Sequence, residues 1–259
     1  MRSGRPTPKM PMSGKRGPDY LIIGGMKCGT TVLNEFIGEH PEVILAKDKE
    51  IHYFSLHLEL GEDWYASFFE DVPAGMVTGE ASPTYLDIAD GPMLPRLISN
   101  TLPSVRVIAI IKDPVERAIS HFLHLKNVNL LPALQEMDPS DVFTGDLDRK
   151  YRRDWLADSA LWPLRHVLEF GNFFLHLHQY RLVFGSQLLV VRNEDLLTGG
   201  QNVMDRVFEH LDLDPFASAK FMERRYQTPS SWKVTSTAAR QALEEYYEVD
   251  DRLVRAARW

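Results

Sequence analysis

The chain has 259 residues and a hydrophobic fraction of 44%, which suit one large α/β domain with its own core. Its formal net charge of -7 argues against nucleic acid and polyanionic glycans as partners, because binding either requires a surplus of lysine and arginine. No apolar run approaches the roughly 20 residues of a membrane-spanning helix, so we expect no membrane span.

The first 18 residues carry five basic side chains among proline, glycine and serine, without an apolar centre. This composition predicts a disordered basic leader over residues 1–18 rather than a signal peptide, followed by a single domain over residues 19–259. Cys28 is the only cysteine, so no intramolecular disulfide can form. This favours a reducing compartment, and we expect a cytoplasmic protein.

A glycine-rich loop follows the aliphatic run at 20–23. Apolar residues recur at helical spacing from Val32, so the loop joins a buried strand to the start of a helix. Backbone N–H groups and the positive end of a helix converge at such a loop, which therefore suits a phosphate group. The nucleotide triphosphate loop has the pattern G-x-x-x-x-G-K-[ST], but here Thr30 stands at the lysine position and the lysine lies upstream, at Lys27.

Glu50 and His52 form an E-x-H motif downstream of this loop. If the segment is extended, both side chains fall on one face, where a carboxylate and an imidazole converge on a single proton. An isolated motif of this kind is more often a solvated glutamate beside a histidine at the edge of a core.

The remaining pattern predicts strands and helices that alternate along the chain. Strands are expected at 76–80, 105–111 and 187–191, and helices at 60–69, 114–125, 161–184, 201–211 and 238–258. The run at 105–111 is almost continuously aliphatic, as in a parallel strand buried on both faces. This order predicts an α/β, three-layer, P-loop-like fold with a central parallel sheet flanked by helices. In such a sheet, ligands bind at the carboxyl ends of the strands.

Lys112 and Ser120 are candidates for a second phosphate site. Lys112 ends the 105–111 strand, and Ser120 lies one to two turns into the helix that begins at Pro114. The two side chains can meet at one anionic group, whereas Ser120 alone would be an ordinary surface residue of a helix. Two such sites suit a ligand with two separated phosphates.

Taken in chain order, several segments resemble sulfotransferases that use 3′-phosphoadenosine-5′-phosphosulfate (PAPS), in particular their heparan-sulfate-type branch. The matching segments are Lys27-Cys28-Gly29-Thr30-Thr31, His40-Pro41-Glu42-Val43, Lys49-Glu50-Ile51-His52-Tyr53-Phe54, Trp64-Tyr65, Gly79-Glu80-Ala81-Ser82-Pro83-Thr84-Tyr85 and Lys112-Asp113-Pro114-Val115-Glu116-Arg117-Ala118-Ile119-Ser120. The resemblance is firm from residue 19 to 120, weaker from 171 to 216, and poor between 125 and 162. Such an ordered set is far more specific than one glycine loop.

The resemblance implies that the chain transfers the sulfuryl group of PAPS to an acceptor hydroxyl, releases adenosine 3′,5′-bisphosphate and requires no metal. It implies catalytic roles for Lys27, Glu50 and His52. In the family an arginine and a serine hold the 3′-phosphate, so Lys112 replaces that arginine. The implied cofactor-binding residues are Gly25, Lys27, Cys28, Gly29, Thr30, Thr31, Lys112, Ser120, Arg225, Trp232 and Lys233.

The base that takes the acceptor proton is either Glu50 or His52. The resemblance favours Glu50, because the family has a glutamate at the matching place. Ordinary pKa values favour His52, since a histidine of about 6.5 is a stronger base than a solvated glutamate of about 4.3. Glutamate is the better candidate only if burial raises its pKa or if the imidazole positions it.

Residues 125–160 are expected to form an acceptor-side lid, and residues 222–236 a loop that closes over the cofactor. The heparan-type enzymes usually carry a lysine where this chain has Ala81, and the net charge is also unfavourable for a polyanion. We therefore expect a small-molecule, lipid or glycosylated natural-product acceptor and no nucleic acid. The sequence predicts neither the identity of the acceptor nor the oligomeric state.

Two other functions remain open at this point. A nucleotide kinase or related phosphotransferase has a similar loop but requires Mg²⁺, for which Asp113 is the only candidate carboxylate at a strand end. A non-catalytic module that binds adenosine phosphates would need no base. The presence of Lys27, Glu50, His52 and Ser120 together favours an enzyme over such a module.

Overall fold

The computed structural model describes residues 12, 14–86, 93–128, 135, 137–145, 147, 162–222, 236–257 and 259. Contacts divide the chain into two compact units. The first unit comprises Met1–Gly25, Gly29–Ile111 and Leu177–Arg224, and the second comprises Met26–Cys28, Lys112–His176 and Arg225–Trp259.

A five-stranded sheet in the order β2-β3-β1-β4-β5 forms the centre of the first unit. Its strands are β1 (Tyr20–Gly24), β2 (Val43–Leu45), β3 (Val77–Ala81), β4 (Arg106–Ile111) and β5 (Leu188–Arg192). All four strand pairings are parallel. The central strands β1 and β4 are buried almost throughout, as expected for aliphatic strands covered on both faces.

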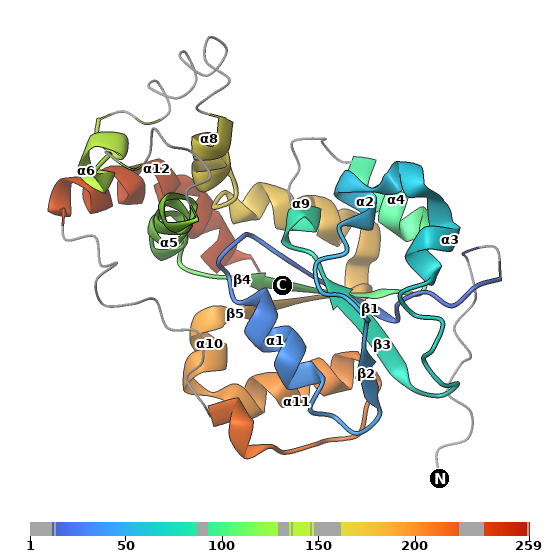
Figure 1. Cartoon of the computed structure of the whole chain (residues 1–259). Coiled ribbons are helices and arrows are strands. Elements are labelled where there is room, and N and C mark those ends of the chain that lie inside the picture. The colour runs from blue at the N-terminus through green and yellow to red at the C-terminus, as the bar shows by residue number, and fades with distance from the viewer. Residues whose placement is uncertain are drawn as a thin grey trace. The chain divides into compact units, whose positions relative to one another are not determined.

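Helices cover both faces of this sheet. Figure 1 shows α1, α10 and α11 on one face, and α3, α4 and α9 on the other. The first unit contains α1 (Thr30–Ile37), α2 (Tyr53–Leu56), α3 (Gly61–Ala66), α4 (Met93–Thr101), most of α9 (Phe173–Phe184), α10 (Asn193–Thr198), α11 (Gly200–His210), and the 3₁₀ turns η1 (Leu58–Leu60), η2 (Pro83–Leu86), η5 (Gly185–Gln187) and η6 (Ala219–Met222). The predicted three-layer α/β fold with a parallel sheet is confirmed.

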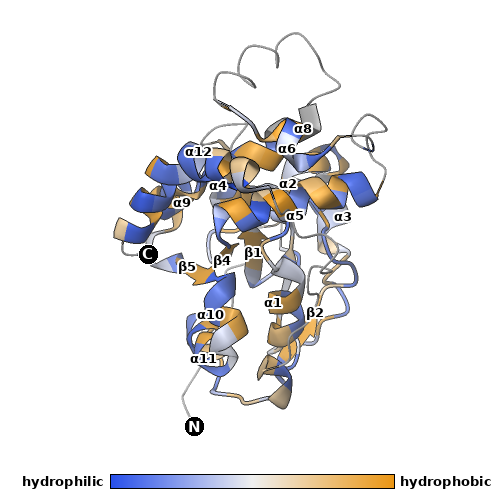
Figure 2. Cartoon of the chain, turned by 90° about the vertical axis from the view of Figure 1, so that its left-hand side faces the viewer, coloured by the Kyte–Doolittle hydropathy of each residue, from blue (hydrophilic) through white to orange (hydrophobic). Residues whose placement is uncertain are grey.

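The second unit is helical and has an apolar core of its own. Its helices are α5 (Pro114–Asn127), α6 (Pro139–Val142), α8 (Trp162–Glu169) and α12 (Thr237–Ala256). Figure 2 shows both hydrophilic and hydrophobic residues along α12. The buried side chains of α12, among them Leu243 and Tyr247, pack with Ile119 and Phe122 of α5 in one cluster.

Part of the predicted acceptor-side lid belongs to this core. Val142, Phe143 and Leu147 are buried in the cluster, and the ring of Phe143 lies 5.5 Å from that of Phe122. Their apolar side chains complete the core of the second unit, and the role of the segment as a lid stays a prediction. Most of the remaining predicted lid, at 129–134 and 148–160, lies outside the described residues.

Arg117 of α5 is fully buried in the second unit. Its guanidinium donates hydrogen bonds to the carbonyl of Val167 and to Nδ1 of His121, the latter at 3.2 Å. The hydroxyl of Tyr247 donates to the carbonyl of Leu168 at 2.7 Å. These bonds satisfy carbonyls in the last turn of α8, where a cation is also favoured by the helix dipole. Arg117 is therefore a structural residue that holds α5 against α8.

The end of the predicted basic leader makes contacts within the first unit. Met12 is fully buried, and the guanidinium of Arg16 donates to Asp19 at 2.6 Å and to the carbonyl of Met76 at 2.8 Å. Met12 and Arg16 therefore pack against the first unit, and the disordered basic leader over residues 1–18 stays a prediction. The start of the leader, at 1–11, lies outside the described residues.

Candidate active site

The loop between β1 and α1 requires glycine at two positions. A Cβ on Gly24 would lie 2.6 Å from the carbonyl oxygen of Ile110, and a Cβ on Gly29 would lie 2.3 Å from Nδ2 of Asn193. Gly29 also has a left-handed backbone with φ of 99° and begins α1 without a side-chain cap. The first turn of α1 contains no acidic residue. Its N–H groups and positive end are thus arranged as in anion-binding helix starts.

We expect Gly29→Ala to destabilise the protein more than an ordinary glycine replacement. The new methyl group would adopt an unfavourable backbone conformation and also overlap the amide of Asn193. Chemical denaturation would measure the free energy of unfolding.

The matched control for this substitution is Gly75→Ala. Gly75 has a similar left-handed backbone with φ of 87°, but a Cβ there would meet nothing within 4 Å. It should cost only the backbone strain of about 1–2 kcal/mol. An equal loss for the two variants would show that Asn193 moves aside, and that the close approach at Gly29 is unimportant.

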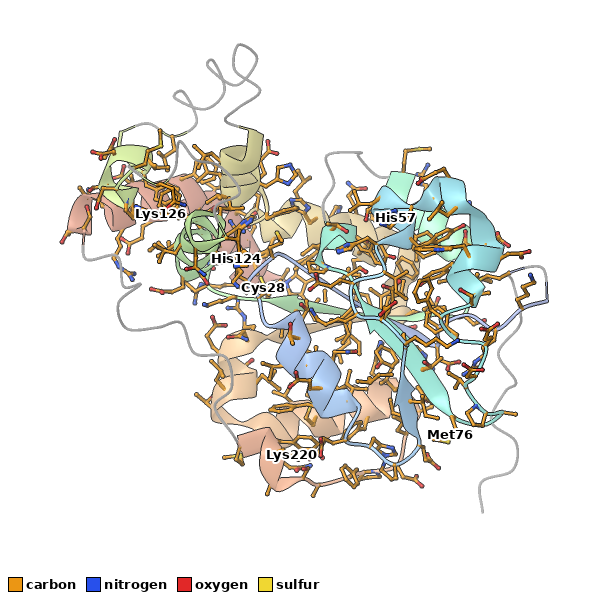
Figure 3. All side chains as sticks on the ribbon, in the orientation of Figure 1. Cys28, His57, Met76, His124, Lys126 and Lys220 are labelled. Atoms are coloured by element: carbon orange, nitrogen blue, oxygen red, sulfur yellow. The ribbon has the colours of Figure 1, made fainter. Side chains whose placement is uncertain are left out.

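Lys27 and Cys28 belong to the loop that follows β1 and precedes α1, and Cys28 is labelled in Figure 3. Lys27 is exposed and left-handed, with φ of 71°, whereas Cys28 is fully buried. A left-handed lysine is strained, because its Cβ approaches the following carbonyl oxygen. Burial shields the thiol of Cys28 from solvent, whereas Lys27 is the exposed cation of the loop.

Glu50 and His52 come together, but not in the way that their spacing suggested. Both are left-handed, with φ of 63° and 54°, and His52 is the N-cap of α2. The expectation of an extended segment is therefore wrong. The carboxylate and the imidazole nevertheless meet, with Nε2 of His52 3.7 Å from Oε2 of Glu50. Two left-handed residues, one on each side of Ile51, replace the alternation of a strand, and their side chains still meet.

The electrostatics of this pair keep Glu50 ionised. The imidazole of His52, with a smaller contribution from Lys49, lowers the pKa of Glu50 to about 2 against the opposing effect of burial. Lys49 contacts the other carboxylate oxygen. Of the two conditions that would make Glu50 the base, a pKa raised by burial is not met, whereas positioning by the imidazole is.

Hydroxyl groups hold His52 on its remaining sides. Its backbone N–H donates to Oγ of Ser82 at 2.9 Å, and its Nδ1 lies 2.8 Å from Oγ1 of Thr84. The hydroxyl of Ser55, one turn along α2, lies 2.6 Å from the same Thr84 oxygen. Both imidazole nitrogens therefore have a polar neighbour.

The buried carboxylate of Glu80 is connected to His52 through Ser82. Glu80 at the end of β3 is 1% exposed and accepts hydrogen bonds from Ser82 at 2.6 Å, Tyr65 at 2.6 Å and Tyr85 at 2.8 Å. Burial raises the pKa of Glu80 above its ordinary 4.5, although the three hydroxyl donors act in the opposite direction. Ser82 thus links the buried carboxylate to the backbone of His52. Sequence reasoning assigned no role to Glu80, although the segment that contains it was noted.

The predicted second phosphate site lies in the second unit, at the start of α5. Ser120 is buried on this helix, and Lys112 is partly exposed just before it. Asp113 is the N-cap of α5, where its carboxylate accepts the N–H of Glu116 at 2.9 Å, and Pro114 follows at the first helical position. The carboxylate proposed as the Mg²⁺ ligand of a kinase therefore has a structural use.

Three of the predicted cofactor-binding residues lie outside the described residues, as does nearly all of the predicted cofactor-closing loop. These residues are Arg225, Trp232 and Lys233. Within the described part of the chain, no group of three or more histidine, cysteine, aspartate or glutamate side chains is arranged to hold a metal ion.

Comparison with known families decides the class of this site. The model of the sulfotransferase domain matches residues 17–239, which include most of both units and every predicted site residue. This chain belongs to the sulfotransferase domain family. The sulfotransferase family consists of enzymes that transfer sulfuryl groups, with PAPS as their general donor, so the chain is an enzyme of that class.

The curated relatives of this sulfotransferase include enzymes of the heparan-sulfate type that its sequence resembles. It is 27% identical over 216 residues to the bifunctional heparan sulfate N-deacetylase/N-sulfotransferase 1 of Caenorhabditis elegans, a match covering 81% of this chain and 24% of the relative. It is 35% identical over 123 residues to the membrane-associated sulfotransferase kil1 of Dictyostelium discoideum, covering 46% of this chain and 26% of the relative. The matched regions thus span about a quarter of these relatives.

No helix in the described part of this sulfotransferase is long and apolar enough to cross a membrane. The predicted cytoplasmic location stays a prediction.

Solved structures share the fold of this sulfotransferase. A sulfotransferase from Alicyclobacillus acidocaldarius superposes with a TM-score of 0.71 at 22% identity, covering 93% of this chain and 95% of that one. Mouse sulfotransferase SULT7A1, which was solved in complex with PAP, gives a TM-score of 0.55 at 15% identity over 96% of this chain and 94% of that one. The fold predicted from the sequence is thus that of known sulfotransferases.

Proposed function

We propose that this sulfotransferase uses PAPS as its donor and a hydroxyl group as its acceptor. One observation carries the assignment of the reacting residues. Four non-glycine residues have a left-handed backbone in the described chain, and three of them are Lys27, Glu50 and His52. Strain of this kind costs about 1–3 kcal/mol per residue and collects at functional sites, where it is part of the mechanism. These are the three residues that the sequence proposed as catalytic.

The residues present fit the donor. The glycine loop and the uncapped start of α1 suit the phosphosulfate end, and the loop residues Gly25, Lys27, Cys28, Gly29, Thr30 and Thr31 would hold it. Lys112 and Ser120 would hold the 3′-phosphate, with Arg225, Trp232 and Lys233 as candidates on the adenosine side. Bound PAPS supplies an activated sulfuryl group, which requires no metal in this proposal.

The residues of the chain then have separate roles. Glu50, oriented by His52, accepts the proton of the acceptor hydroxyl as its oxygen bonds to sulfur and the bond between sulfur and the phosphate oxygen breaks. The ammonium of Lys27 stabilises the negative charge that collects on the departing phosphate oxygen. In this proposal Glu50 acts on the acceptor hydroxyl and Lys27 on the departing phosphate oxygen.

The acceptor is proposed to be a small-molecule, lipid or glycosylated natural-product alcohol. Ala81, which stands where heparan-type enzymes usually carry a lysine, is fully buried at the end of β3 and offers no cation. The net charge of -7 further weakens the attraction of a polyanionic glycan. Both features support an acceptor of low charge.

We expect adenosine 3′,5′-bisphosphate to stabilise the protein more than AMP or ATP does, without added metal, because it alone engages both phosphate sites. A ligand at 100 times its dissociation constant adds about 2.7 kcal/mol, which a thermal-shift series resolves. In Ser120→Ala the advantage of the bisphosphate over AMP should shrink.

The same series tests the other functions. Stabilisation by Mg-ATP but not by the bisphosphate would identify a phosphotransferase. Stabilisation by the bisphosphate without sulfuryl transfer from PAPS to any member of an alcohol panel would identify a binding module.

A further inference from the structure

We propose that Thr84, supported by Ser55, is a positioning residue that fixes the tautomer of His52. The proposal rests on the proposed function for its kinetic consequence, but not for its structural one. Thr84 lies in the 3₁₀ turn η2 and Ser55 in α2, both within the first unit. Neither residue was singled out by the sequence analysis.

The contacts leave two possible directions for the hydrogen bonds. Oγ1 of Thr84 lies 2.8 Å from Nδ1 of His52 and 2.6 Å from Oγ of Ser55, and either partner can donate in each contact. Oγ of Ser55 also lies 3.4 Å from the carbonyl of His52, to which it can only donate. Each hydroxyl has a single proton, so choosing one bond fixes the others.

The carboxylate of Glu50 determines which of the two hydrogen-bond directions is adopted. Oε2 of Glu50 lies 3.7 Å from Nε2 of His52, and the lowered pKa of Glu50 keeps it anionic. A neutral imidazole with a bare Nε2 would present a lone pair to this anion, whereas Nε2–H is attracted to it. Neutral His52 therefore carries its proton on Nε2, Thr84 donates to Nδ1, and Ser55 donates to Thr84.

The same two hydroxyls also accommodate a protonated imidazole. Nδ1–H then donates to Thr84, Thr84 donates to Ser55, and Ser55 turns to the carbonyl of His52, so every proton keeps an acceptor. Rotation of two hydroxyl protons is the only change required. In the neutral state Nε2–H holds the carboxylate of Glu50 in place, which leaves that carboxylate as the group able to accept the acceptor proton.

The structural part is tested by NMR of ¹⁵N-histidine-labelled protein without donor or acceptor. The nine histidines require an assignment, and His52→Gln identifies the signals of His52. At about pH 9, well above the ordinary histidine pKa, the wild-type imidazole should carry its proton on Nε2. Thr84→Val removes the donor to Nδ1 and should give a mixture of tautomers. A wild-type Nδ1–H tautomer, or the same pure tautomer in Thr84→Val, would overturn the proposal.

The kinetic part uses matched substitutions. Thr84→Val should lower kcat by about 10-fold, which is less than the 10²–10⁴-fold that loss of the proton acceptor itself would cost, and should leave bisphosphate binding unchanged. Thr84→Ser keeps the hydroxyl and should restore kcat. Thr78→Val is the control, because Thr78 is fully buried in β3 and its hydroxyl has no hydrogen-bond partner.

Failure of this proposal and failure of the proposed function are distinguishable. If Thr84→Val folds poorly, Ser55→Ala removes the donor to Thr84 and should shift the tautomer in the same direction. A fixed Nε2–H tautomer in a protein that never turns over PAPS would sustain the positioning role and refute the donor. Full turnover of Thr84→Val would refute the positioning role alone.

Discussion

Replacing Glu50 by glutamine is expected to lower turnover by roughly 10²–10⁴-fold, the usual contribution of a general base, while leaving bisphosphate affinity intact. Glutamine keeps the shape of the side chain, and its carbonyl oxygen can still lie near Nε2 of His52, which is 3.7 Å from Oε2 of Glu50. It cannot take the acceptor proton. Measurement of kcat at saturating donor, with a thermal shift by the bisphosphate as the binding readout, separates the two effects.

The opposite assignment has its own signature. If Glu50→Gln keeps nearly wild-type turnover while His52→Ala is inactive, His52 is the base and Glu50 orients it. The pKa of Glu50, lowered to about 2, makes this a demanding test, because such a carboxylate is a weak base in the free protein. Binding of an acceptor hydroxyl to Glu50 must therefore weaken its contacts with His52 or Lys49 if the glutamate is to accept the proton.

The lowered pKa of Glu50 also has a defined pH dependence. A carboxylate with a depressed pKa favours the folded state above its ordinary pKa of 4.5, and that contribution is lost as the pH falls towards about 2. Protonation of Glu50 in the free enzyme should therefore not cause an acid limb in the profile of kcat/KM at or above pH 4.5. Such a limb would have to come from another group.

The elements of the fold that could be predicted from the sequence are those that a local pattern of residues determines. The aliphatic runs at β1 and β4 predicted buried parallel strands, and the Asp113-Pro114 pair predicted the start of α5. Helix α10 was missed, because Asn193–Thr198 is short and follows directly on β5. The burial of Val142, Phe143 and Leu147 was missed for another reason, since their partners on α5 and α12 are distant in sequence.

In the candidate site, too, the sequence predicted some features and missed those that depend on the three-dimensional arrangement. The residue types of Glu50 and His52 correctly predicted that the two side chains interact. Their spacing, however, suggested an extended backbone, whereas both residues are left-handed. The Glu80 cluster was beyond sequence reasoning, since Tyr65, Ser82 and Tyr85 reach the carboxylate from different elements. A buried glutamate is stable only when such donors surround it, and no local pattern reveals them.

Lys27→Ala should lower kcat by about 10²–10³-fold, the range found when one stabilising donor is removed from a developing oxyanion. Donor affinity should fall much less, because the charge on the departing oxygen develops only in the transition state. Alanine retains a Cβ, so the left-handed backbone at φ of 71° is strained in both proteins and the comparison isolates the ammonium.

Two other substitutions make this result specific. Lys220→Ala removes an exposed lysine, labelled in Figure 3, that pairs with Glu39 at 2.7 Å on the surface of the first unit, and it should leave kcat unchanged. Ser120→Ala should show the reverse of Lys27→Ala, with weaker bisphosphate binding and little loss of turnover at saturation. If Lys27→Ala and Ser120→Ala both reduce affinity alone, Lys27 is a phosphate anchor, and stabilisation of the departing oxygen must come from the backbone N–H groups of the loop.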